Sequence, residues 1–559
     1  MPVGNTTRGH RFLSEGEIAV EGAEDYFDKL ASAYVILDHD RRRSLIDSDL
    51  KQSAKGDGLE VKDDPGLLDE VAGLVEFPVV LMGAIDDASM ELPPEVLATT
   101  MRTHQKYFSC LKPDGGSAPR FLFVANNLTP DDGKTIVAGN ERVLKARLAD
   151  ARFFWDQDRK VPLASRVEAL KDRIYHAKLG AMYDKVQRMA ALTEFLIAHV
   201  PGADKKLARR AALLAKADLS TGMVGEFPEL QGVMGRYYAL HDGEDPSVAD
   251  AIADHYKPLG PNDTCPTAPD SIVVALADKL DSLAAFFAID EKPTGSRDPF
   301  ALRRAAQGII RLVLENELRL SLRKAFEHAL RPSWPGLTRP STSTSEERES
   351  VDARIKSGHD EDLATEIGVN SMVASLIEFV FDRLRVHVRD QGISHDLIAA
   401  AWNPRRNEFE TVSRDLQRED DLTRFIRRVR ALQNFLRTED GANLLVAYRR
   451  ASNIVDIEER RDGRLYNDPV YTNRFQQDEE RTLYQLLIEI SSALDTYLGD
   501  EEFDAVMRRL ATLRRPVDEF FDKVTVNADD LALRENRLRL LSRIRAVMNQ
   551  VADFSQIEG

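Results

Sequence analysis

The sequence contains only two cysteines, Cys110 and Cys265, which are far apart and form no CxxC pattern. This excludes a disulfide-stapled scaffold and a cysteine-rich zinc site, and it favours a reducing, cytoplasmic compartment. No apolar run approaches the roughly 20 residues that a membrane span needs, which excludes an integral membrane protein. The first residues, 1–12, also lack the apolar stretch of a secretory signal.

The signatures of several enzyme classes are missing as well. The sequence has no glycine-rich P-loop, no HIGH-like or KMSKS-like nucleotide signature and no GxSxG elbow. The residues alone therefore show no complete active site.

The length and charge of the chain indicate a large globular protein. Its 559 residues are enough for about three to five domains. Apolar residues make up 43% of the chain and charged residues 30%, as in soluble globular proteins. The net charge of −17 argues against nonspecific coating of nucleic acids. A local basic face can still bind phosphates, because charges act over about a Debye length.

Two kinds of segment follow one another along the chain. Up to about residue 160, short β-rich runs at 74–82 and 120–125 flank a short helix at 93–101, which indicates an α+β domain. Beyond this point apolar residues recur at helical spacing, and no strong strand signal follows residue 298. We therefore predict a mainly α, multidomain fold. Its expected parts are an α+β domain at 1–160, a helical HD-like domain at 161–330, an insertion at 331–360, a helical linker region at 361–440 and a C-terminal helical domain at 441–559.

The segment 331–360 differs from its surroundings. It is rich in proline, serine, threonine and charge, and it has no apolar face. It is similar to a translated repeat element inserted into a bacterial gene. We expect a solvated, disordered insertion between two helices, with a functional loop as the alternative. Further helices are expected at 373–390, 422–436, 481–498, 500–513 and 531–551.

Histidine and aspartate residues in the middle of the chain are of the types that hold metals in HD-superfamily phosphohydrolases. They are the pair His241-Asp242, with Asp218, Asp278 and Asp281. Two metals held there could activate water against a phosphoester. The spacing fits poorly, because the HD pair lies beside a glycine at an expected helix end. Asp278 and Asp281 could equally form salt bridges on their helix. We favour an HD-like scaffold that has lost its metal ligands.

Two basic segments are candidates for binding phosphate or RNA. The first begins a helix after Asp298 and Pro299, where the basic side chains could bind phosphate; a structural turn with ion pairs is the alternative. In the second, at 139–155, basic residues precede three aromatic residues, a mixture typical of RNA-binding surfaces. On a helix such aromatics often belong to a core, and we weigh the two interpretations evenly. The first segment contains Arg297, Arg303 and Arg304; the second contains Arg142, Lys145, Arg147 and Arg152, then Phe153, Phe154 and Trp155.

A dense set of arginines lies on the predicted C-terminal helix. They share it with Leu538 and Leu541, so one face can pack while the arginines face a partner. This density in an acidic protein suggests contacts with phosphates or base edges. The alternative is a solvated face in which the arginines form salt bridges with Asp529, Asp530 and Glu535. The arginines are Arg534, Arg537, Arg539, Arg543 and Arg545.

Characteristic motifs follow one another over nearly the whole chain, among them GHRF at 9–12, HQKYF at 104–108, GNERVL at 139–144 and DPFALRR at 298–304. Together they resemble the β subunit of the bacterial heterotetrameric glycyl-tRNA synthetase. The C-terminal run ADDLALR at 528–534 is similar to a DALR-type anticodon-binding domain. Eleven matches in the right order make chance negligible. The other matches are AYVILD at 33–38, LPPEVL at 92–97, RFLFVAN at 120–126, RLADARFF at 147–154, QGVMG at 231–235 and HDGE at 241–244.

This resemblance implies that a separate α subunit carries the class II active site, which makes glycyl-adenylate from glycine and ATP with Mg. The present chain would bind and position tRNA(Gly) for ATP-dependent glycylation, in a cytoplasmic assembly of two α and two β subunits. We therefore expect no catalytic residue and no metal ligand in it. The candidate tRNA-binding residues are Arg534, Arg537, Arg539, Arg543, Arg142, Lys145, Arg303 and Arg304.

Two features depart from the family pattern. The family's β subunit begins with further N-terminal domains before GHRF, so we expect either a late gene start or a truncated chain. The insertion at 331–360 is also absent from the pattern. Two rival hypotheses stay open: an HD-superfamily phosphohydrolase that uses His241, Asp242 and Asp278, and a helical scaffold with no role in RNA binding.

Overall fold

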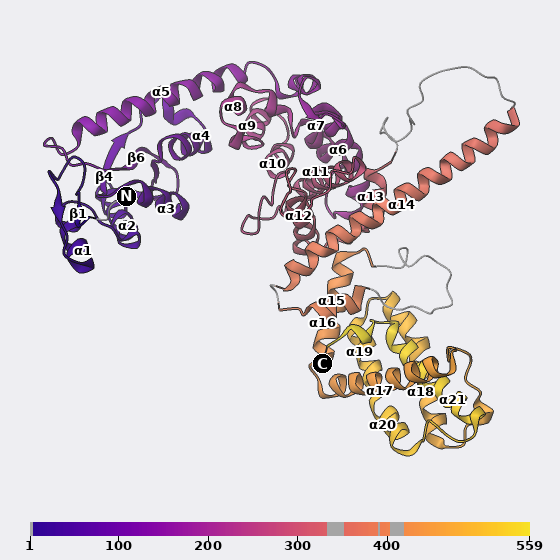
Figure 1. The fold of residues 1–559 in the computed structure, drawn as a ribbon. Helices are drawn as coiled ribbons and strands as arrows, with labels where there is room; N and C mark the ends of the chain where they lie inside the picture. Colours follow the sequence, from indigo (N-terminus) through magenta and orange to yellow (C-terminus); the bar gives the residue numbers. More distant parts are fainter. Residues whose placement is uncertain (1–3, 332–350, 390–391, 403–418, 559) are drawn as a thin grey trace. The chain divides into compact units, whose positions relative to one another are not determined.

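The computed structural model describes residues 4–331, 351–389, 392–402 and 419–558 (Figure 1). The chain divides into two compact units. Unit 1 consists of Met1–Tyr175, Ala181–Tyr183 and Leu213–Ala253, and unit 2 of His176–Gly180, Asp184–Ala212 and Asp254–Gly559. Helices far outnumber strands in the described residues, so the prediction of a mainly α, multidomain fold is confirmed. The helices of the predicted 161–330 domain are shared between the two units, and the five-part division stays a prediction.

A four-stranded antiparallel sheet forms the centre of unit 1, in the order β3-β5-β6-β4. The predicted β-rich runs supply β4 and β6, whose pairing begins at Val79 opposite Ala125. Opposite Phe121 on β6 the partner strand has Gly83, and a Cβ atom there would come within 2.4 Å of the Phe121 ring. Glycine is thus required where the ring lies against the backbone. The strands are β3 (Glu60–Val61), β4 (Val79–Ala84), β5 (Phe108–Leu111) and β6 (Ser117–Ala125).

The helices α2 (His39–Gly56) and α3 (Pro65–Leu74) share a hydrophobic core with the sheet. Buried side chains such as Ile46, Leu67 and Leu122 form this core. Each helix starts at an aspartate whose carboxylate accepts backbone N–H groups, which satisfies donors that a helix start leaves free.

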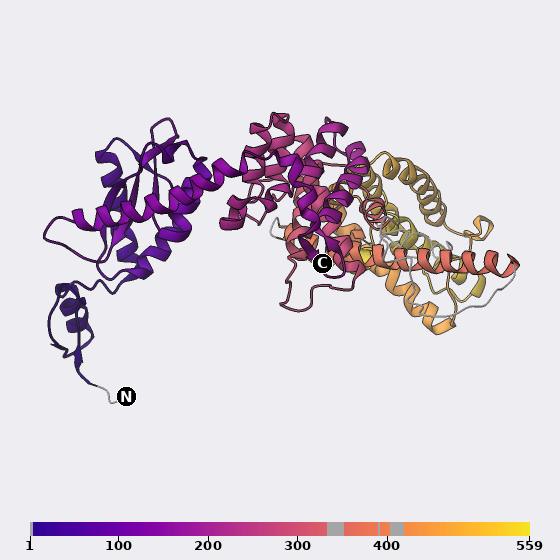
Figure 2. The same cartoon turned by 90° about the horizontal axis from the view of Figure 1, so that it is seen from above.

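The long helix α5 (Lys134–Asp158) contacts β4 and runs on to the short helices of unit 1 (Figure 2). It contains the predicted basic and aromatic segment 139–155. The other elements of unit 1 are β1 (Thr6–Thr7), β2 (Ile18–Ala19), α1 (Ala23–Ser32), α4 (Pro94–Thr99), a π-helical turn (Thr100–Gln105), α8 (Gly222–Glu226), α9 (Val233–His241) and most of α10 (Pro246–Asp254).

Unit 2 is built almost entirely of helices, and its N-terminal part surrounds the nearly fully buried α11. Several helix starts carry sequence signals: Pro269 is the first residue of α11, and Asp421 and Asp530 cap α16 and α21. The helices are α6 (Met182–Leu196), α7 (Lys205–Leu214), α11 (Pro269–Ala288), α12 (Leu302–Glu315), α13 (Leu322–Ala329), α14 (Val351–Arg389), α15 (His395–Trp402), α16 (Leu422–Leu436), α17 (Glu439–Asp462), α18 (Asp478–Gly499), α19 (Phe503–Ala511), α20 (Arg514–Lys523) and α21 (Leu531–Asn549). The last residues of α7 belong to unit 1.

The structure modifies two expectations in unit 2. The helical pattern at 301–330 is split between α12 and α13, where Glu317 takes a left-handed conformation with φ of 50°. Of the insertion predicted to be disordered, residues 332–350 lie outside the described residues. Residues 351–360 belong to α14, which therefore starts earlier than the helix predicted at 373–390. The disorder of the insertion stays a prediction.

No helix in the described part of the chain combines the length and the apolar character that crossing a membrane requires.

Candidate nucleic-acid interface

The histidine and aspartate of the predicted HD pair do not meet the other metal-ligand candidates of unit 1. His241 ends α9 with an exposed side chain, and Asp242 accepts the backbone N–H of Leu163 at 2.6 Å. Asp218 is fully buried and accepts N–H groups from Gly232 at 2.5 Å and Gly235 at 3.1 Å. Burial raises the pKa of the Asp218 carboxyl to about 6, although the backbone donors lower it. Asp242 and Asp218 therefore stabilise loops and helix starts by accepting their backbone N–H groups.

The two aspartates on α11 form ion pairs in unit 2. Lys185 lies 3.1 Å from Asp278 and 3.2 Å from Asp281, and Arg188 donates to Asp281 at 2.6 Å. Within the described residues, no group of three or more His, Cys, Asp or Glu side chains could hold a metal ion. The phosphohydrolase hypothesis therefore lacks the shared donor set that it requires.

The basic residues of α5 lie on its solvent side. Arg142 is exposed and has no ion pair among the described residues. The Lys145 side chain is 73% exposed, and its Nζ lies 3.7 Å from Asp86. Both residues line a pocket of about 350 Å³ beside the end of β4. Arg147 is exposed as well, whereas Arg152 forms ion pairs with Glu91 and Asp156. Arg142 and Lys145 can therefore reach a ligand without breaking a buried contact.

The aromatic residues after these cations differ in burial. Trp155 is buried and stacks on Tyr238 with ring centroids 5.7 Å apart. Phe154 covers Gly222, where a Cβ atom would approach its ring to 2.5 Å. Only Phe153 points outward, with 57% of its area exposed. The core interpretation is thus correct for Trp155 and Phe154, and Phe153 remains available at the surface.

The predicted phosphate-binding start of α12 is capped by its own aspartate. Asp298 accepts the N–H groups of Leu302 at 2.8 Å and Arg303 at 2.9 Å, which occupies donors that an anion would use. Arg303 also donates to the carbonyl of Gly295. Arg304 is exposed. Arg297, which precedes the capping aspartate, is exposed too. This geometry is that of a structural turn with two solvent-facing arginines.

The arginines of α21 lie inside the C-terminal bundle. Arg537 donates to Glu480 of α18 at 2.9 Å and to the carbonyl of Thr525 at 2.7 Å, and Glu480 is fully buried. Arg534 pairs with Glu458 and Asp462 of α17, and these hydrogen bonds raise the pKa of Arg534. A buried pair of this kind is strongly destabilised when one partner is removed. Arg534 and Arg537 therefore hold α21 to α17 and α18.

Two of the remaining arginines of α21 also form ion pairs within the C-terminal bundle. Arg539 pairs with Glu535 at 2.6 Å and Asp468 at 3.0 Å, while Arg545 pairs with Asp456 and Glu459. The Nε of Arg543 is buried and has no hydrogen-bond partner in the described part of the chain.

A solvated face is therefore the wrong description of Arg534, Arg537 and Arg539. Of the expected partners only Glu535 pairs with them, and Asp530 instead caps α21. A role of these arginines in tRNA binding stays a prediction.

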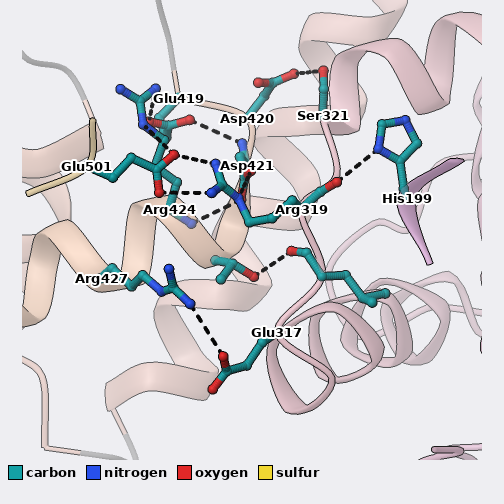
Figure 3. Close-up of polar contacts among 12 residues, drawn as sticks. His199, Glu317, Arg319, Ser321, Glu419, Asp420, Asp421, Arg424, Arg427 and Glu501 are labelled. Carbon is teal, nitrogen blue, oxygen red and sulfur yellow. Dashed lines mark hydrogen bonds and ion pairs between the residues drawn. The ribbon is translucent and has the colours of Figure 1, made fainter. Parts of the chain in front are cut away.

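A cluster of acidic and basic side chains joins the turn between α12 and α13 to the start of α16 and to the turn between α18 and α19 (Figure 3). Arg319 donates to Asp421 at 2.7 Å and forms two hydrogen bonds with Glu501. Arg424 adds ion pairs with Glu419 at 3.2 Å and Glu501 at 3.6 Å. We call this set of five side chains the junction.

The backbone around the junction is held in the same way. His199 Nδ1 lies 2.9 Å from the carbonyl oxygen of Arg319, and the Thr423 hydroxyl donates to the carbonyl of Leu318 at 2.7 Å. The carboxylates of the junction are thus matched by guanidinium groups from the turn between α12 and α13 and from α16. This arrangement fixes how α16, α18 and α19 sit against α12 and α13 within unit 2.

Sequence reasoning missed one exposed aromatic residue in the C-terminal bundle. Tyr471 lies in the segment between α17 and α18 and is 46% exposed. Its ring centroid is 4.8 Å from the guanidinium carbon of Arg474 and 5.1 Å from that of Arg539. The segment has no helical periodicity, and the one local signal is the i, i+3 spacing of a tyrosine and an arginine.

Comparisons with known proteins agree with the features of both units. A family model described as glycyl-tRNA synthetase beta subunit matches residues 1–403, and one described as DALR anticodon binding domain matches residues 444–558. Similar proteins named glycine–tRNA ligase beta subunit include those of three bacteria. The protein from Rhodospirillum centenum is 50% identical over 560 residues, which covers 100% of this chain and 72% of that relative. Those from Dinoroseobacter shibae and Paracoccus denitrificans are 48% and 47% identical over 562 residues, covering 100% of this chain and 75% and 74% of the relatives. The second family model spans α18 to α21 and most of α17.

Proposed function

Because this chain belongs to the family of glycyl-tRNA synthetase β subunits, and so is an aminoacyl-tRNA synthetase subunit, we propose that it binds and positions tRNA(Gly) while an α subunit carries out the chemistry. The family resemblance predicted from the sequence is thereby confirmed. The single observation that carries the proposal is the pair of family matches that together span most of the chain, the second of them an anticodon-binding domain.

The side chains of the chain support a role in binding rather than in chemistry. The carboxylates that could have formed a metal site pair with Lys185 and Arg188 or hold backbone N–H groups. Exposed cations remain on α5 and at Arg304, and these can neutralise phosphates. Holding a tRNA in the right place lowers the entropic part of the barrier to a reaction at its end.

The proposal assigns the other components to the partner. Glycine, ATP and Mg bind the α subunit, and two α and two β subunits assemble in the cytoplasm. This chain then contributes the tRNA surface: the C-terminal bundle for the anticodon, and the cations of α5 for the phosphate backbone.

An aminoacylation assay tests the proposal. The α subunit alone, this chain alone and the mixture are given glycine, ATP, Mg and tRNA(Gly). We expect charging only in the mixture, together with a stable complex of this chain and the tRNA in a gel shift. If the chain ignores tRNA(Gly) in the presence of the α subunit, the proposal is wrong. Metal analysis and phosphohydrolase assays on the same preparation check the rival hypothesis, which predicts bound metal and nucleotide hydrolysis.

A further inference from the structure

We propose that Tyr471 and Arg474 form a stacking site for an unpaired base of the bound tRNA. The inference rests on the proposed function and adds the residues in the C-terminal bundle that hold a base. Single-stranded RNA is recognised largely by stacking of its unpaired bases on aromatic rings and on arginine guanidinium planes. Tyr471 and Arg474 offer one of each, with the guanidinium carbon 4.8 Å from the ring centroid.

The backbone of Tyr471 is held firmly. Its N–H donates to Asn536 Oδ1 at 2.8 Å, and its carbonyl accepts from Asn536 Nδ2 at 3.0 Å. Asn536 lies fully buried in α21, so both bonds connect the segment to the rigid bundle. Arg539, itself paired with Glu535, lies 5.1 Å from the ring and restricts its movement further. A ring fixed before binding loses little conformational freedom when a base stacks on it.

Tyr471 differs from the other tyrosines near α21 in the hydrogen bonding of its hydroxyl group and in its exposure. The hydroxyl groups of Tyr448 and Tyr466 donate to Asn549 and Asp462, and both rings are buried. The Tyr471 hydroxyl has no hydrogen-bond partner among residues 4–331, 351–389, 392–402 and 419–558. Tyr471 as a whole residue is 46% exposed, so part of it faces solvent, whereas the two buried tyrosines complete the core.

Cations suited to phosphates lie nearby at the same end of α21. Arg464 pairs with Glu535 of α21 at 3.1 Å, yet half of its side chain is exposed. With Arg460, Asp456 and Glu459 it lines an open pocket of about 380 Å³ where α17 ends, and both carboxylates there pair with Arg545. An aromatic ring flanked by guanidinium groups on a surface with solvent-reaching arginines is the combination that binds single-stranded nucleic acid.

Hairpin binding to the full chain tests the proposal. The probe is an RNA hairpin with the sequence of the tRNA(Gly) anticodon stem-loop, measured at several salt concentrations. Tyr471→Ala should bind about tenfold more weakly, with an unchanged salt dependence because no phosphate contact is lost. Tyr471→Phe should bind as the unaltered chain does, since stacking needs the ring and not the hydroxyl.

The control is Phe521→Ala, which removes another ring of the same bundle, one that lies under Arg450 at 4.3 Å. It should leave hairpin binding unchanged. Equal affinities of Tyr471→Ala and the unaltered chain would overturn the proposal, as would a loss of binding in Tyr471→Phe as large as that in Tyr471→Ala. In either case, tRNA charging by the unaltered chain with its α subunit would show that the proposed function itself stands.

Discussion

Helices α5 and α21 both carry several basic residues, but the two sets differ in burial. On α5, Arg142 and Lys145 lie in solvent, and the nearest carboxylate to Lys145 is 3.7 Å away. On α21, Arg537 is buried and the Arg534 side chain is only 12% exposed, and the two bind carboxylates of α18 and α17. Cations of the first kind can attract a phosphate backbone, whereas those of the second kind are committed to holding helices together.

The difference shows that the number of arginines on a helix does not decide what they bind. What decides it is whether acidic side chains from other helices face them. Arg537 meets Glu480, which is 57 residues away in the sequence, and Arg534 meets Glu458, 76 residues away. Variants of the α21 arginines should therefore lower mainly the stability of the chain, and variants of the α5 cations should lower mainly its affinity for RNA.

The largest effect is expected for Arg537→Ala. It leaves the fully buried Glu480 without its guanidinium partner, so the free energy of unfolding should fall by about 3–5 kcal/mol. Chemical denaturation followed by circular dichroism measures this change. The double variant Arg537→Met with Glu480→Gln should recover part of the loss, because it removes both charges and keeps an oxygen that accepts the N–H groups of Gln476 and Gln477. Wild-type stability of Arg537→Ala would break the comparison.

Asp218 is a buried carboxylate that binds backbone N–H groups, whereas Glu480 binds an arginine. The two can be compared through the pH dependence of stability. The pKa of Asp218 is about 6 in the folded chain against an ordinary value of 3.8. The folded state therefore holds the proton more tightly, and the stability that this contributes is complete below pH 4 and is lost as the pH rises to about 6.

Asp218→Asn retains the oxygen that accepts from Gly232 and Gly235 but cannot ionise. It should abolish this part of the pH dependence, which amounts to roughly 2–3 kcal/mol. Thermal unfolding between pH 4 and 8 measures it. An unchanged pH profile in the variant would show that the pKa of Asp218 is the same in the folded and unfolded chain.

The junction offers ion pairs of intermediate exposure. Arg319→Ala removes the contacts to Asp421 and Glu501 and should lower the free energy of unfolding by about 1 kcal/mol. Within unit 2 the junction holds α12, which carries the exposed Arg304, against the C-terminal helices. RNA contacts on these two parts depend on the geometry between them, so full-length tRNA should bind roughly tenfold more weakly while the anticodon hairpin binds normally. Equal losses for both RNAs would mean that the variant disturbs the C-terminal bundle itself. Arg427→Ala, which removes an exposed pair with Glu317 nearby, is the matched control.

The smallest effect is expected on α5. Arg142→Ala and Lys145→Ala should leave the free energy of unfolding within about 0.5 kcal/mol of the unaltered chain. Each should weaken tRNA binding a few-fold and reduce the slope of affinity against salt by about one. Arg152→Ala serves as the control, because this arginine is already paired with Glu91 and Asp156. Unchanged salt slopes for both variants would remove α5 from the RNA-binding surface.

Local signals in the sequence predict much of the fold. The helix predicted at 422–436 has those bounds in the structure because apolar spacing and the capping Asp421 both mark it. The helix expected from residue 531 likewise starts after the cap Asp530. The strand Phe108–Leu111 was not expected, since four residues are too few for a period-two pattern to stand out.

The candidate site was less predictable, because its residues depend on contacts distant in sequence. The sequence identified the cations of α5 and α21 but not which set would be buried. Tyr471 could not be predicted as a site residue, because it lies outside any periodic segment. Asn536, which binds its backbone, also follows 65 residues later in the sequence. The HD pair was a metal-site candidate only because of its residue types. In the structure, Asp242 accepts the backbone N–H of Leu163.

The most direct test of the account measures glycine-dependent exchange of pyrophosphate into ATP, which reports formation of the adenylate without any tRNA. The account predicts no exchange by this chain alone, and an activity that appears when the α subunit is added. Exchange catalysed by the purified chain without its partner would contradict the claim that this polypeptide binds the tRNA and leaves the activation of glycine to another subunit.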